Sequence, residues 1–156
     1  RTSAAARRVL RILIGIGANC LRVAIMNFAQ IDYPLAIQPS HIDHMGHVNN
    51  AVYLNWVQEA VIKHWEKFAP ADAQARYLWV ALKHSITYRK AAFLSDNLIA
   101  SVALEKVKGV RAFYRTAIKR GEEVLAEIDS TWCSVDAESH RPARVAADVV
   151  RRFQRD

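Results

Sequence analysis

The chain has 156 residues, of which 52% are hydrophobic and 24% are charged. This length gives room for one domain, and the hydrophobic fraction is enough for a folded core, which excludes extensive disorder. The net charge of +7 suggests a nucleic-acid partner, but residues 1–25 hold five arginines and no acid, and the other 17 basic residues face 15 acidic ones. Because a nucleic-acid-binding domain concentrates its charge on a folded face, we expect no nucleic-acid partner.

Residues 1–25 differ in composition from the rest. Positions 12–25 are mostly apolar and follow a cluster of arginines. A membrane-spanning helix needs about 20 apolar residues, and Asn19 and Arg22 interrupt this shorter run, so we expect no membrane span. Met26 stands where the globular pattern begins. We therefore expect one domain over 26–156 behind an extension, which is either translated from an upstream reading frame or a real helical arm.

The first elements of the domain are a strand, a loop and a long helix. Residues 32–40 alternate loosely and contain Pro34 and Pro39, which predicts an edge strand. A polar loop over 41–49 leads to a helix that begins at Asn50, repeats apolar residues at three- and four-residue spacing, and ends at Pro70. Apolar residues surround so much of this helix that we expect it to be buried nearly all round.

Four strands are predicted next, over 77–88, 97–107, 110–119 and 123–135, and a short helix after Pro142. Each strand alternates with a period of two residues, and short turns with Gly109 and Gly121 separate the last three, as in antiparallel hairpins. On one face of the first of these strands we expect Leu78, Val80, Leu82, Ile86 and Tyr88.

This order predicts an α+β domain, in which an antiparallel sheet of five or six strands wraps around one long helix. The open edges of such a sheet favour pairing between subunits. The two cysteines, Cys20 and Cys133, have neither CxxC nor zinc-site spacing. Their spacing fits a reducing compartment, and we expect a cytoplasmic protein.

The candidate chemistry lies in HIDHMGHVNNAVYLNW, residues 41–56. Asp43 precedes a tight loop and a helix start, where free N–H groups and the helix dipole can hold a polarised carbonyl oxygen. A carboxylate at that place can attack the carbonyl or deprotonate water, and Gly46 lets the backbone pass close to a ligand. The alternative is that Asp43, Asn49 and Asn50 merely cap a helix.

The string DHMGHVNNAVYLNW, with Glu59 one turn further on, resembles the signature of hotdog-fold thioesterases. It is similar to the 4-hydroxybenzoyl-CoA thioesterase and acyl-CoA thioester hydrolase group, and to plant acyl-ACP thioesterases. The resemblance runs from about Phe28 to Phe153. It implies a hotdog fold and hydrolysis of an acyl-CoA or acyl carrier protein thioester, without cofactor or metal, in a homodimer or homotetramer.

Carried over by position, the resemblance also implies roles for site residues. Asp43 is the nucleophile or the general base, and the backbone N–H of Asn50 polarises the thioester carbonyl. His47 and Asn49 flank the site and hold the loop or orient water. Glu59 lies near the position of the catalytic acid in a second hotdog lineage; alternatively, it bonds to a neighbouring loop.

Substrate contacts are expected from aromatic and basic residues. Tyr53 and Trp56 would line or floor the acyl pocket. The phosphates of the carrier would meet cations at strand ends and turns, and the candidates are Arg89, Lys90, Lys106, Lys108 and Arg111. These cations are otherwise solvated surface charges.

Three other readings stay open. A non-catalytic acyl-CoA-binding hotdog module would gain nothing from Asp43, and a hotdog dehydratase would need a histidine base in a different arrangement. His41, His44 and His47 around Asp43 could suggest a metal site. Evenly spaced loop histidines, with no neighbouring group identified that would orient their rings, do not indicate a metal site, so we expect no metal.

Overall fold

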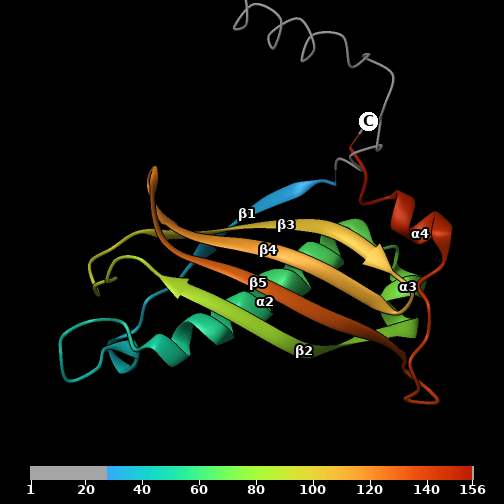
Figure 1. Cartoon of the computed structure of the whole chain (residues 1–156), viewed down its shortest axis with the longest axis horizontal. Coiled ribbons are helices and arrows are strands. Elements are labelled where there is room, and N and C mark those ends of the chain that lie inside the picture. The colour runs from blue at the N-terminus through green and yellow to red at the C-terminus, as the bar shows by residue number, and fades with distance from the viewer. Residues whose placement is uncertain (1–27, 156) are drawn as a thin grey trace, which may run out of the picture.

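A computed structural model describes residues 28–155, so the expected extension over residues 1–25 lies outside the described residues. Figure 1 shows one long helix, α2, that runs along one face of a single sheet. The elements in chain order are β1 (Gln30–Leu35), the short 3-10 helix η1 (Pro39–His41), α2 (Asn50–Phe68), α3 (Ala71–Arg76), β2 (Tyr77–Tyr88), β3 (Leu98–Lys108), β4 (Arg111–Arg120), β5 (Glu123–Asp136) and α4 (Ala147–Arg151). Among these residues, no helix is long and apolar enough to cross a membrane.

The sheet has five strands in the order β1-β3-β4-β5-β2, and every neighbouring pair is antiparallel. The predicted α+β architecture is therefore confirmed, with β1 and β2 as its two edges. The hairpins between β3, β4 and β5 follow from their period-2 patterns and the intervening glycine turns. Since β2 follows α3 along the chain yet pairs with the last strand, the connection through α2 carries the chain from one edge of the sheet to the other.

Helix α2 begins and ends where the sequence predicts. The side chain of Asn49 caps it by accepting a hydrogen bond from the Ala51 N–H, and the helix stops at Phe68, two residues before Pro70. The expectation that it is buried nearly all round is wrong, because one face is polar and exposed in this chain. The exposed residues of that face are Asn55, Gln58, Glu59, Lys63, Glu66 and Lys67.

Strand β2 has the predicted bounds but not the predicted faces. Its pairing with β5 shifts register between Ala81 and Lys83, so the strand has a β-bulge at Leu82. A bulge reverses the alternation of side chains that follow it. Leu78 and Val80, before the bulge, and Leu82, at the bulge, are 46%, 47% and 51% exposed on the outer face. Ile86, beyond the bulge, lies on the opposite face and packs against the core.

Two further boundaries differ from the prediction. Strand β1 covers Gln30–Leu35 rather than residues 32–40, because the chain leaves the sheet before η1, which starts at Pro39. The six-residue helix α3 was not expected, since it is too short to show a helical apolar period. The short helix after Pro142 is confirmed as α4, and Val149 and Phe153 are buried there.

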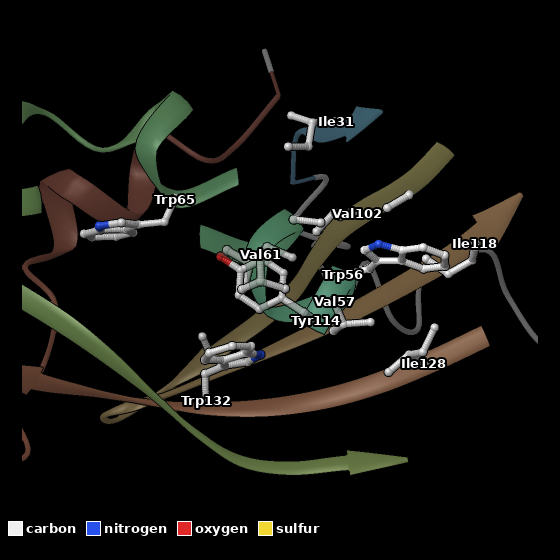
Figure 2. Packing of buried hydrophobic residues seen from close by; sticks show 14 of the residues in the cluster. Ile31, Trp56, Val57, Val61, Trp65, Val102, Tyr114, Ile118, Ile128 and Trp132 are labelled. Carbon is white, nitrogen blue, oxygen red and sulfur yellow. The ribbon is translucent and has the colours of Figure 1, made fainter. Parts of the chain in front are cut away.

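The core lies between α2 and the sheet. Figure 2 shows side chains of the helix facing those of the strands. The buried residues labelled there from α2 are Trp56, Val57, Val61 and Trp65, and those from the sheet are Ile31, Val102, Tyr114, Ile118, Ile128 and Trp132.

The imidazole of His64 is fully buried in this core. Its Nε2 lies 2.7 Å from the carbonyl oxygen of Ala29, which can only accept, so Nε2 carries the proton. Its Nδ1 lies 3.4 Å from the Tyr114 hydroxyl and can accept from it. This pair of contacts suits a neutral imidazole, and desolvation by burial lowers the pKa of His64.

We therefore expect the free energy of unfolding to fall as the pH drops below about 6.5, the ordinary histidine pKa, because the unfolded chain then takes up a proton that folded His64 does not. The substitution His64→Gln, which keeps a donor for Ala29, should flatten this dependence between pH 7 and pH 5. Urea unfolding at both pH values measures the effect. An equally steep dependence in the variant would contradict the assignment.

Candidate active site

The loop before α2 folds into a very short hairpin. Ile42 and Val48 pair across it. The Asp43 N–H donates to the His47 carbonyl over 2.8 Å, and the Gly46 N–H donates to the Asp43 carbonyl over 3.0 Å. Gly46 takes φ +78°, in the left-handed region that favours glycine. The backbone thus closes a tight turn whose shape is fixed by its own hydrogen bonds.

This turn also fixes the carboxylate of Asp43. Oδ1 accepts from the backbone N–H of Met45 over 2.8 Å and from that of His47 over 3.3 Å. Among the described residues, no group hydrogen-bonds to Oδ2. The side chain is half-buried. One oxygen therefore orients the carboxylate, and the other is available to a ligand.

The first turn of α2 lies next to that carboxylate. With Asn49 as the cap, Asn50 is the first helical residue, and its N–H donates to no acceptor among residues 28–155. The Tyr88 hydroxyl, at the end of β2, donates to the Asn50 carbonyl over 2.8 Å. The ring of Tyr53 packs edge-on against that of Tyr88, with centroids 5.2 Å apart. The helix start is thereby tied to the edge of the sheet.

A cavity of about 260 Å³ opens between the loop, the helix start and the end of β2. The structure thus brings together most of the predicted site: Asp43, His47, Asn50, Tyr53, Arg89 and Lys90, with Met45, Val48, Tyr88 and Ala91, line this cavity. Asn49 and Gly46 shape the backbone beside it. Tyr88 was not predicted as a site residue, because its role depends on the bulge that turns it toward α2.

The cations at the rim of this cavity are paired with acids. Arg89 donates to Glu127 through Nε over 2.6 Å, and Lys90 pairs with Glu123. Arg120 bridges Glu123 and Asp96, at 2.5 Å and 2.8 Å. Lys90 and Arg120 together lower the pKa of Glu123 by hydrogen bonds and charge. The rim is therefore an ordered network with equal numbers of positive and negative groups.

Glu59 and Trp56 lie in a different cavity, of about 300 Å³, on the β1 side of α2. Oε1 of Glu59 accepts from the Tyr33 hydroxyl over 2.5 Å, and this hydrogen bond raises the pKa of Tyr33. Glu59, for which the resemblance implies a possible catalytic role, therefore lines a different cavity from Asp43 within one chain. Lys108 lies at the β3–β4 turn, at the other end of the sheet from the Asp43 loop (Figure 1).

The loop histidines point to different neighbours. Nδ1 of His41 accepts from the Gln38 N–H over 3.2 Å, and its ring packs edge-on against Trp56. The ring of His47 instead packs edge-on against Phe93. Within residues 28–155, no three His, Cys, Asp or Glu side chains gather in a group that could hold a metal ion.

The chain is similar in sequence to known thioesterases. A family model described as the thioesterase-like superfamily matches residues 37–153. The long-chain acyl-CoA thioesterase FadM of Escherichia coli is 24% identical over 127 residues, which cover 77% of this chain and 94% of that protein.

Solved structures confirm the predicted hotdog fold. A predicted thioesterase from Bacillus stearothermophilus superposes with a TM-score of 0.72 at 17% identity, over 80% of this chain and 94% of that one. A Thermus thermophilus thioesterase complexed with coenzyme A and zinc gives a TM-score of 0.68 at 19% identity, over 78% and 90% of the two chains.

The turn geometry makes a prediction about Gly46. A Cβ added there meets nothing within 4 Å, so any cost of Gly46→Ala comes from the backbone alone. We expect Gly46→Ala to lower the free energy of unfolding by about 1 kcal/mol, and Gly46→Asn to cost less, since asparagine tolerates the left-handed region. Urea unfolding measures both. Equal losses in the two variants would contradict a purely conformational role.

Proposed function

This chain belongs to the thioesterase-like superfamily, a family of enzymes that hydrolyse thioesters, and we propose that it hydrolyses acyl-CoA thioesters in the cavity beside Asp43. The products would be a free carboxylic acid and a thiol. One observation carries the proposal: an oriented carboxylate and the free N–H at the start of α2 line the same cavity.

The Asn50 N–H supplies the electrophilic half of this chemistry. In the proposed pose the thioester carbonyl oxygen accepts from it, and the positive end of the helix dipole stabilises the negative charge that develops on this oxygen. Because Tyr88 and the Asn49 cap hold the first turn in place, this donor needs no rearrangement when the charge forms.

Asp43 supplies the other half by one of two routes. As a general base it takes a proton from water, whose oxygen attacks the carbonyl carbon while the C–S bond breaks and the thiolate is protonated. As a nucleophile its carboxylate oxygen attacks the same carbon and expels the thiolate, and water then cleaves the resulting anhydride. Both routes consume one water and regenerate the carboxylate.

The preference for acyl-CoA rests on relatives and on the rim of the cavity. The relative from Escherichia coli is named a long-chain acyl-CoA thioesterase, and the Thermus thermophilus structure contains coenzyme A. Arg89 and Lys90 lie at the mouth of the cavity. There the phosphate groups of the substrate would take the place of the carboxylates of Glu127 and Glu123 as their partners. An acyl carrier protein is the other possible carrier. Lys108 would reach this cavity only from a second subunit.

A homodimer or homotetramer is also part of the proposal. In the described chain, β2 pairs only with β5, which leaves its other edge open. The exposed side chains Leu78, Val80 and Leu82 lie along this strand. An open apolar edge strand favours pairing with a second copy.

The buried free thiol of Cys133 fits a reducing compartment, such as the cytoplasm.

Thiol release from a panel of aliphatic and aromatic acyl-CoAs tests the proposal. In Asp43→Asn the amide oxygen can still accept from Met45 and His47, but it can neither attack nor take a proton. We expect kcat to fall by about a hundredfold or more. Glu59→Gln, the matched control in the other cavity, should stay within a few-fold of the wild type.

Two results would contradict this assignment. A wild-type rate in Asp43→Asn would exclude the carboxylate from the chemistry. Absence of turnover in the wild type, with tight binding of acyl-CoA, would instead indicate a non-catalytic acyl-CoA-binding module.

A further inference from the structure

Two segments at the end of the sheet opposite Asp43 form a strongly basic surface. They are the tip of the β3–β4 hairpin, residues 106–111, and the C-terminal segment, residues 141–155. All their cations are exposed, and we call this surface the basic end: Lys106, Lys108, Arg111, Arg141, Arg144, Arg151, Arg152 and Arg155. Asp148 is the one acid in the two segments.

The two segments are neighbours in the fold. The Ser134 Oγ lies 3.2 Å from the carbonyl oxygen of Val110 and 2.6 Å from that of Ala143, so one buried residue joins the hairpin tip to the C-terminal segment. Apolar residues of both segments also pack around one small interior cavity. Figure 1 shows α4 and the β3–β4 turn at the same end of the molecule, with the Asp43 loop at the other.

The described residues give these charges no acidic partners, although the Lys106 ammonium lies over the Phe113 ring. Within residues 28–155, none of the eight cations forms an ion pair. Asp136, close by, pairs instead with Arg76 and accepts from the turn that follows it, and that turn also carries Glu138. At the opposite end, by contrast, Arg89, Lys90 and Arg120 are all paired with acids. Among residues 28–155, no carboxylate therefore neutralises these charges, and they are available to an anionic surface.

We propose that the basic end binds the surface of an anionic lipid bilayer. A bilayer requires only several exposed cations spread over one side of a protein, each worth about 1 kcal/mol near the surface. Single-stranded nucleic acid would need aromatic side chains for base stacking, yet the large exposed apolar residues all lie outside the two segments: Met45, Leu78, Val80, Leu82, Tyr88, Phe93, Leu94 and Ile99.

The sequence that precedes the described residues points the same way. Phe28 pairs with Gln154, and the Ala29 N–H donates to the Phe153 carbonyl over 2.7 Å, so the chain enters the fold beside Arg152 and Arg155. Residues 1–25, just upstream, combine five arginines with a mostly apolar run and contain no acid. Basic and apolar residues together are the composition of segments that lie on anionic membranes.

Sedimentation with vesicles tests this proposal without reference to catalysis, so its outcome is independent of the thioesterase assignment. The full chain is mixed with vesicles of phosphatidylcholine, or of equal parts phosphatidylcholine and phosphatidylglycerol. We expect binding to the second kind only, and its loss at high salt, which screens exposed charges.

A pair of matched triple variants locates the contact. Arg144→Gln, Arg151→Gln and Arg152→Gln together should weaken vesicle binding by roughly a hundredfold, at about 1 kcal/mol for each cation. The control combines Lys63→Gln, Lys83→Gln and Arg115→Gln, which remove the same charge from exposed positions away from the two segments, and it should bind as the wild type does. Far-ultraviolet circular dichroism checks that both variants are folded.

Several results would overturn the proposal. They are equal binding to both kinds of vesicle, equal losses in the two triple variants, and undiminished binding by the basic-end variant, which would place any contact elsewhere in the chain. A basic-end variant that binds vesicles normally but has a raised KM for acyl-CoA would instead assign these cations to substrate phosphates.

Discussion

The burial of one face of α2 against the sheet is the constraint on which the rest of the structure depends. Val57 and Ala60 are fully buried, with Val61 and Trp56 almost so, and the sheet holds the helix along that line of contact. Since the helix cannot slide or rotate, its first turn has a fixed place relative to the end of β2. Tyr88 and the Asn49 cap then fix the direction in which its free N–H groups point.

The loop that holds Asp43, residues 42–48, is placed beside this fixed helix start. Its backbone hydrogen bonds close the turn and occupy one carboxylate oxygen, leaving the other beside the helix start. In the proposed mechanism, the donor for a developing oxyanion and the base or nucleophile for the carbonyl carbon therefore reach one cavity, because the loop geometry acts on a helix start that the sheet holds in place. Glu59 shows the reverse case. It is on the same helix, but the helical rotation turns it to the β1 side, where Tyr33 binds it.

Much of the fold was readable from the sequence because its signals are periodic. The strands with period-2 alternation and the helix from Asn50 were predicted within a few residues. The bulge at Leu82 was not, since a single extra residue leaves the alternation on each side intact while exchanging its faces. The C-terminal end of β1 and the whole of α3 could not be predicted for a related reason, because each element has only six residues, too few to establish a period. The residues of the proposed site that lie within one stretch of sequence could be predicted to lie together, whereas Tyr88 meets Asn50 only through the pairing of β2 with β5.

The distribution of charge over the surface was the property that could least be predicted from the sequence. The domain after Met26 has nearly balanced totals, which suggested that its charge carries no information. In three dimensions Glu123, Glu127 and Asp96 pair with the cations around the Asp43 cavity, whereas the eight cations of the basic end lie together at the opposite end. Totals cannot reveal such a separation, because it depends on which strand ends and turns the fold brings to each side.

A crystal structure with a non-hydrolysable thioether or ketone analogue of an acyl-CoA would examine the proposed chemistry at its reacting atoms. With the ketone analogue, the carbonyl oxygen should lie within hydrogen-bonding distance of the Asn50 N–H, with the carbonyl carbon facing the Asp43 carboxylate. An acyl group seated beside Glu59 and Tyr33, with the Asp43 cavity empty, would contradict the assignment and transfer the catalytic role to the second acid.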